Sequence, residues 1–358
     1  MPTSTDLTGK TPEVSQTQAH NRIEYLDNYD VKLALIPQVK AVADYLYLDS
    51  ASFWATLWTL PTSDVQALLD ELRQPSKASS LRFELMSFAM NIPIFMRIFR
   101  GSHARRPYAD VFAAMAASPA PQRNENEALI ASQRDDNKCV ITDTCDPTVC
   151  YVFPLASLEQ HHQHAGKLSL YSLTKLWGDD RIIRLMGKLF NTDSGDLTAI
   201  NTAANMICLD ETLREWWNMA VPGGPQGRRW RIRLRFHWLK KAAIHDLTSV
   251  VDFSVDPVPM LQEPDEGPPE ILNATTRRSV ESGQAFTVTA GSPRELPDYD
   301  ILRLQWDLLR MWRLAGGADP ATYTLDVWDT WEPETQATGD DAESWQSSTT
   351  LALGRRPA

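Results

Sequence analysis

The sequence predicts an α+β protein that is largely helical and carries additional β-strands, and three patterns lead to this prediction. Apolar residues recur with helical spacing over residues 30–117. Two short β-branched runs flank a turn at 143–147, and residues 229–239 alternate between basic and apolar side chains. Since 43% of the 358 residues are hydrophobic, the chain can bury a sizeable core. We therefore expect a globular protein.

The N-terminal helical region contains two clear elements. Residues 65–72 place apolar side chains three and four positions apart after a capping cluster at 62–64, and this pattern predicts a helix. Residues 81–99 are apolar nearly all round, but charged residues such as Arg82 interrupt the run. Because Pro93 lies within it, we expect a buried, broken helix and not a membrane span.

The middle of the chain predicts a β-hairpin followed by helices. Residues 138–142 and 149–155 are the two β-branched runs, and the segment between them is rich in turn-forming residues. A helical region at 158–190 follows, and a further helix begins at Asp210.

Residues 229–239 predict a strand with one apolar face and one basic face that also holds His237. The basic face could bind phosphates of a nucleic acid or of a small molecule. It could also be the solvated side of an edge strand, where charges prevent aggregation between sheets. The net charge of the chain favours the second interpretation.

The last third predicts one strand and one helix. Residues 284–289 alternate like a strand, and residues 301–314 form an amphipathic helix that Gly316 and Gly317 stop. These patterns together predict a division into a flexible N-terminus 1–29, a helical region 30–127, a core 128–254, a C-terminal extension 255–322 that packs on the core, and an acidic, flexible tail 323–358.

Composition excludes several classes of function. The chain has 35 Lys and Arg against 46 Asp and Glu, and its formal charge of -11 repels a polyanion, so nucleic acid is not an expected partner. Four cysteines are too few for a disulfide scaffold, and we expect reduced thiols. The N-terminus is polar and no run of about eighteen apolar residues occurs, so we expect no signal peptide, no membrane partner and a cytoplasmic location.

Four segments, in order, carry a family resemblance. They read RDDNKCVITDT at 134–144, VCYVFP at 149–154, NMICLDETLREWW at 205–217 and RIRLRFHWLKK at 231–241. They resemble the HNH-nuclease-like family found in fungi, whose members read approximately RDxxxCVxTGT, CHIxPF, NMxxLxxxLHxWW and FHWL. The resemblance implies an HNH-like ββα core, a β-hairpin and a helix around one divalent cation, embedded in the helical protein.

The resemblance also implies site residues. The family's general base, a histidine, matches Tyr151, the asparagine that orients it matches Asn205, and the metal-binding histidine matches Arg214. A phenol with a pKa of about 10 is a poor base, and a guanidinium offers a cation no lone pair, so nuclease chemistry, a metal and other cofactors are not expected. The predicted catalytic residues are Tyr151, Asn205 and Arg214, and the predicted substrate pocket holds Trp216, Trp217 and His237.

Other side chains could still bind a metal. His161, His162 and His164 offer three imidazoles, and Cys145 and Cys150 offer thiolates. Adjacent histidines in a polar stretch are more often solvated surface, and the cysteine spacing matches no standard zinc pattern. Core packing is likewise the common role of paired tryptophans.

Three classes of function follow from this sequence. We expect a small-molecule enzyme that needs no metal and carries out a cyclisation or isomerisation in fungal secondary metabolism, within the former nuclease cleft. The first alternative is a non-catalytic pseudonuclease that binds a partner. The second is a metal-dependent endonuclease with displaced ligands.

Overall fold

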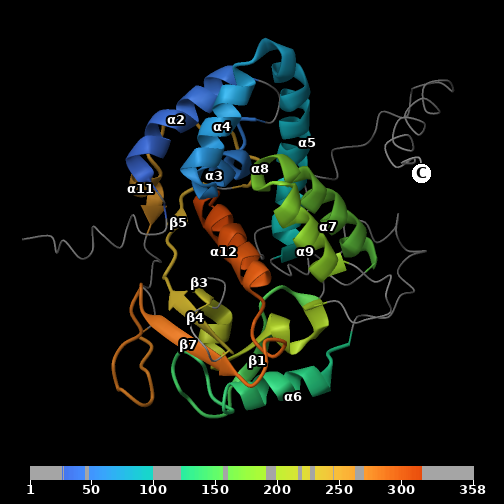
Figure 1. Ribbon diagram of the computed structural model, residues 1–358. Coiled ribbons are helices and arrows are strands. Elements are labelled where there is room, and N and C mark those ends of the chain that lie inside the picture. The colour runs from blue at the N-terminus through green and yellow to red at the C-terminus, as the bar shows by residue number, and fades with distance from the viewer. Residues whose placement is uncertain are drawn as a thin grey trace, which may run out of the picture.

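A computed structural model describes residues 26, 28–44, 48–99, 122–155, 160–190, 199–216, 220–225, 230–244, 246–262 and 270–316 (Figure 1). Helices and small antiparallel sheets alternate along the chain, which confirms the α+β class. The described helices are α2 (Tyr29–Val42), α3 (Ala51–Thr59), α4 (Thr62–Leu72), α5 (Pro75–Phe99), α6 (Glu125–Arg134), α7 (Gln160–Ser172), α8 (Thr174–Trp177), α9 (Asp179–Phe190), α10 (Glu211–Trp216), α11 (Pro257–Met260) and α12 (Tyr299–Leu314), with 3-10 turns η2 (Ala199–Asn201) and η3 (Ala203–Asn205). The described strands are β1 (Thr148–Tyr151), β2 (Met206–Leu209), β3 (Ala220–Pro225), β4 (Trp230–Phe236), β5 (Lys241–Ala242), β6 (Leu261–Gln262) and β7 (Ala285–Ala290).

The N-terminal helices pack as predicted, with one correction. Helix α4 begins at Thr62 and buries the apolar stripe that its spacing predicts. The break expected near Pro93 is absent, because α5 runs through it as one helix of 25 residues. A proline removes a single intrahelical donor, and α5 packs against both α4 and α7, which holds the helix together on either side.

The predicted hairpin is wrong in its pairing. Strand β1 pairs antiparallel with β2, so that Thr148 lies opposite Leu209 and Tyr151 lies opposite Met206. It does not pair with residues 138–142. Lys138 instead forms an isolated antiparallel bridge with Cys145, the Cys139 amide donates to the Thr144 carbonyl, and residues 140–142 form a turn. The β-branched run therefore marks a buried turn beside the sheet.

Strand β4 confirms the predicted alternation but not the predicted edge position. It lies between β3 and β7 in a three-stranded antiparallel sheet. Ile232, Leu234 and Phe236 are buried, while the arginines between them are exposed. His237 follows the end of the strand and is buried, so it does not share the arginine face.

Helix α12 connects the two halves of the molecule. It passes through the middle of Figure 1, between the helices α2 to α5 and the β3–β4–β7 sheet. Asp298 caps its first turn by accepting hydrogen bonds from the amides of Asp300 and Ile301. Leu304, Leu308 and Met311 are fully buried, as the amphipathic pattern predicts.

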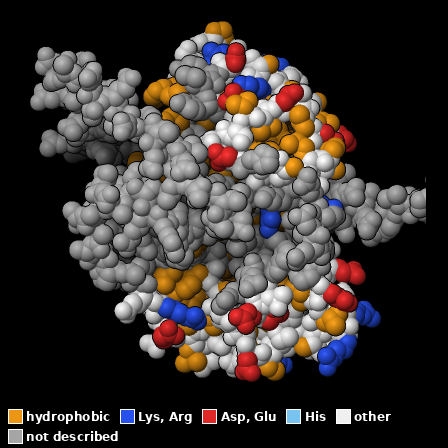
Figure 2. Space-filling model, turned by 180° about the vertical axis from the view of Figure 1, so that it is seen from behind, with side chains coloured by type: hydrophobic (Ala, Val, Ile, Leu, Met, Phe, Trp, Pro, Cys, Tyr) orange, Lys and Arg blue, Asp and Glu red, His pale blue; other side chains and the backbone are white. Residues whose placement is uncertain are grey.

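The described surface mixes charges of both signs. On the face shown in Figure 2, acidic and basic side chains are interspersed over both ends of the described surface. None of the helices described here, α5 included, is long and apolar enough to cross a membrane.

Gly316 follows the last residue of α12, and substituting it tests how the helix ends. Its φ is 67°, and a Cβ there would collide with the carbonyl of Ile244. We expect Gly316→Ala to lower the free energy of unfolding by about 1–3 kcal/mol, because both the conformation and the contact are unfavourable. Urea unfolding monitored by tryptophan fluorescence measures this change.

Gly187→Ala is the matched control for that substitution. Gly187 lies within α9 and a Cβ there would meet nothing within 4 Å. We expect it to raise the free energy of unfolding by about 0.5–1 kcal/mol, because alanine favours a helix over glycine. Equal effects of the two substitutions would contradict the described end of α12.

Candidate functional site

A paired set of two strands and the helix that follows them surrounds Tyr151 and Asn205. Strands β1 and β2 pair, and α10 follows β2 directly. Asp210 begins the helix, because its carboxylate accepts a hydrogen bond from the Leu213 amide at 2.8 Å. The second carboxylate oxygen accepts from the Thr142 hydroxyl at 2.7 Å, so the buried turn holds the helix cap in place.

A buried ion pair joins this unit to α6. Arg134 and Asp135 are neighbours in sequence with fully buried side chains, and two bonds of 2.7 Å connect the guanidinium to the carboxylate. Arg134 also donates to the carbonyls of Ala203, Met206 and Glu295. Asp135 accepts from the Cys208 amide of β2. The pair therefore binds backbone from three segments that are distant in sequence.

Asn205 is a structural residue in this geometry. Its side chain is fully buried, accepts from the Phe153 amide at 2.7 Å and donates to the carbonyls of Phe153 and Ile200 at 2.8 Å each. These bonds continue the β1–β2 pairing beyond Tyr151 and occupy both amide donors. Asn205 thus positions the backbone beside Tyr151 and makes no described bond to the phenol.

Tyr151 is held as a hydrogen-bond donor. Its hydroxyl donates to Oδ1 of Asn201 at 2.9 Å, and Asn201 in turn donates to the Gln122 carbonyl. The half-buried ring packs against an alanine-rich face of α6. Burial raises the pKa of Tyr151, the charge of Glu125 raises it further, and Arg123 opposes both. The phenol is therefore neutral at pH 7.

Sequence reasoning missed Asn201, although the repeated asparagines in NTAAN were a signal.

The other predicted site residues divide into two groups. The side chains of Arg214 and Trp216, and the whole of Trp217, lie outside the described residues. His237 is buried, and its ring centroid lies 5.8 Å from that of Trp306.

Metal ligands do not converge in the part of the chain that the structure describes. There, no three His, Cys, Asp or Glu side chains lie close enough together to hold an ion. The side chains of His161, His162 and His164 lie outside the described residues. Cys150 is buried and Cys145 is exposed, and neither forms a disulfide bond.

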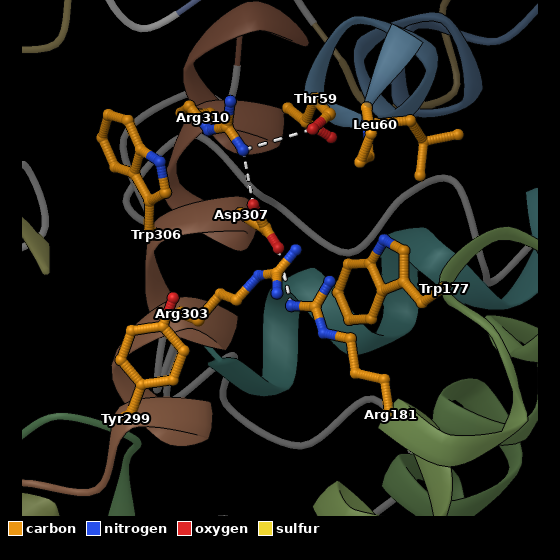
Figure 3. Close-up of a pocket in the computed structure, with 10 residues that line it drawn as sticks. Thr59, Leu60, Trp177, Arg181, Tyr299, Arg303, Trp306, Asp307 and Arg310 are labelled. Atoms are coloured by element: carbon orange, nitrogen blue, oxygen red, sulfur yellow. Dashed lines mark hydrogen bonds and ion pairs between the residues drawn. The ribbon is translucent and has the colours of Figure 1, made fainter. Parts of the chain in front are cut away.

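A cavity of about 380 Å³ lies between α12, α9 and the end of α3, away from Tyr151 (Figure 3). Arginines and aromatic rings dominate its wall. These residues are Arg181, Arg303, Arg310, Trp177, Tyr299 and Trp306.

One carboxylate organises the cavity wall. Asp307 accepts from Arg181 at 2.6 Å and from Arg310. The guanidinium of Arg181 lies 4.0 Å from the centre of the Trp177 ring, and that of Arg310 lies 4.8 Å from the centre of the Trp306 ring. The predictions missed this cavity, although Tyr299, Arg303 and Arg310 lie on one stripe of α12.

The sequence matches no protein-family model, and neither a curated protein nor a solved structure is significantly similar to it.

The ion pair provides a direct stability prediction. Arg134→Gln leaves the Asp135 carboxylate buried without its cation and removes donors from three carbonyls. We expect the free energy of unfolding to fall by about 3–5 kcal/mol. Urea unfolding measures it, with the exposed Arg73→Gln as a control that changes by no more than about 0.5 kcal/mol. A loss below about 1 kcal/mol for Arg134→Gln would refute the role assigned to the pair.

The cysteines provide a prediction about reactivity. Burial raises the pKa of the Cys139 thiol, and burial together with the charge of Asp135 raises the pKa of Cys208 to about 12. Because the thiolate is the reactive form, N-ethylmaleimide should modify only Cys145 among the four cysteines of the folded protein. Mass spectrometry of peptides identifies the site. Rapid modification of Cys139 or Cys208 before denaturation would show that these thiols are accessible.

Proposed function

We propose that this protein is a small-molecule enzyme of the isomerase or cyclase type, built on an HNH-like ββα unit and acting without a metal. One observation carries the proposal: the phenol of Tyr151 is neutral and donates a hydrogen bond. Tyr151 stands where the resembling family has its general base. Fungal secondary metabolism is the setting that the resemblance favours.

The backbone beside the resembling motifs supports the ββα part of the proposal. In the family pattern TGT, glycine stands where this chain has Asp143. Asp143 has a φ of 57°, in the left-handed region that glycine favours and aspartate tolerates. Its carboxylate accepts from Asn273 at 2.9 Å, which stabilises the conformation without glycine. Strands β1 and β2 pair and α10 follows β2, but α7, α8 and α9 lie between the two strands where the family unit has a hairpin turn.

The chemistry follows from the protonation of Tyr151. A neutral phenol cannot serve as a base toward water, but it can donate to an oxygen on which negative charge develops. In the described state the acceptor is the amide oxygen of Asn201. We propose that a substrate carbonyl takes the place of this amide oxygen, and that the hydrogen bond stabilises the negative charge that develops on the carbonyl oxygen when a hydroxyl of the same substrate adds to the carbonyl carbon. The new C–O bond replaces the π bond of the carbonyl, the proton of the hydroxyl passes to the former carbonyl oxygen, and this cyclisation conserves the atoms of the substrate.

Asn205 and the Arg134–Asp135 pair are positioning residues in this scheme. Their polar atoms are used by the backbone around β1 and β2, so they fix where the phenol lies. This full use of polar groups also favours the alternative of a non-catalytic binding protein, in which the same unit is only a scaffold. Substitution of Tyr151 separates the two.

Tyr151→Phe should abolish conversion while leaving the fold intact. The substitution removes one hydroxyl and keeps the ring that packs on α6, so the melting temperature should change by only a few degrees. The protein is incubated with a small-molecule extract of its host, and liquid chromatography with mass spectrometry detects pairs of compounds of equal mass that exchange abundance. Wild-type protein should convert one compound into another, and Tyr151→Phe should not.

Tyr171→Phe is the matched control, because Tyr171 lies on α7 with 64% of its surface exposed. It should convert the compound at the wild-type rate. The rate should also be level from pH 6 to 9, because the raised pKa of Tyr151 keeps the donor protonated throughout that range. Conversion by Tyr151→Phe at the wild-type rate would contradict the proposal, and so would the absence of any equal-mass pair.

A further inference from the structure

We infer that the α12 cavity is a binding site for a small organic carboxylate with an aromatic body. This site is separate from Tyr151, and the inference does not rest on the proposed function. It is carried by the arrangement of charge and aromatic rings in the wall of the cavity (Figure 3).

Charge in the cavity is unbalanced toward the positive. Three guanidinium groups and one carboxylate line the cavity, and that carboxylate, Asp307, is already bonded to both Arg181 and Arg310. Arg303 makes no hydrogen bond or ion pair with another described residue. In a chain with a formal charge of -11, this local excess of cations selects for an anion.

The directions of the Arg303 and Arg181 side chains also favour an anion in the cavity. Arg303 reaches from α12 and Arg181 from α9, and Figure 3 shows their guanidinium groups pointing toward one another in front of Asp307. Two like charges that converge on one space repel each other unless an anion lies between them. Arg181 is also largely buried, with 11% of its side chain exposed, so solvent screens its charge only weakly.

The cavity also determines the chemical class of the ligand. A planar guanidinium fork matches the two oxygens of a carboxylate, and Arg303 is available for this geometry. A phosphate dianion would bring more charge against the nearby Asp307 carboxylate. Rings of Trp177, Tyr299 and Trp306 supply faces for an aromatic body. A volume of about 380 Å³ suits a small molecule and not a polymer.

Calorimetric titration with 1-naphthoate tests the inference. At low salt the full-length protein should bind one equivalent, and Arg303→Gln should weaken binding at least tenfold. Arg303 is exposed, so this variant should retain the wild-type melting temperature. Arg278→Gln is the matched control, since it removes the same charge from an exposed position in the segment before β7, and it should bind as wild type.

Two further probes define the class of ligand. The neutral analogue 1-naphthalenemethanol should bind at least tenfold more weakly than 1-naphthoate. Inorganic phosphate at about 10 mM, roughly the concentration that occupies weak anion sites, should not displace the carboxylate. The Tyr151→Phe variant should bind 1-naphthoate as wild type does, so the failure of one proposal would leave the other standing.

Any of four results would overturn the inference. They are the absence of naphthoate binding to the wild-type protein, equal binding by Arg303→Gln, equal binding of the neutral analogue, and displacement by phosphate.

Discussion

The buried pair of Arg134 and Asp135 is the constraint on which the β1–β2 unit depends. The two residues lie at the end of α6, yet their bonds reach η3, β2 and the segment before α12. A buried ion pair is stable only where hydrogen bonds satisfy its remaining atoms, and here backbone groups supply them. The placement of β2, and through β2 of β1 and Tyr151, follows from this pair.

Local patterns in the sequence predicted local structure well. The spacing of apolar residues identified α4 and α12, and the two-residue alternation identified β4, because each pattern reflects one buried face of a single element. The pairing of β1 was mispredicted because its partner lies after three intervening helices. A local signal cannot distinguish a strand from a buried β-branched turn such as residues 138–142.

The candidate sites were less predictable than the fold, for a similar reason. Tyr151 was found from a motif, but its partner Asn201 is 50 positions away. The α12 cavity joins Arg181 to Asp307 across 126 positions, and only the stripe on α12 could be read from the sequence. His237 was predicted to lie in a substrate pocket, and in the structure its buried ring lies next to Trp306, which lines the α12 cavity. Helix α12 therefore links the sheet to that cavity.

We propose that the unit formed by β1, β2 and α10 serves as a scaffold for chemistry without a metal. The most direct measurement is plasmid cleavage by the purified protein with added Mg²⁺, Mn²⁺ or Zn²⁺, taken together with its metal content by elemental mass spectrometry. We expect intact plasmid in every case and no stoichiometric metal. Cleavage by a protein that carries one equivalent of metal would contradict it and would direct attention to His161, His162 and His164 as ligands.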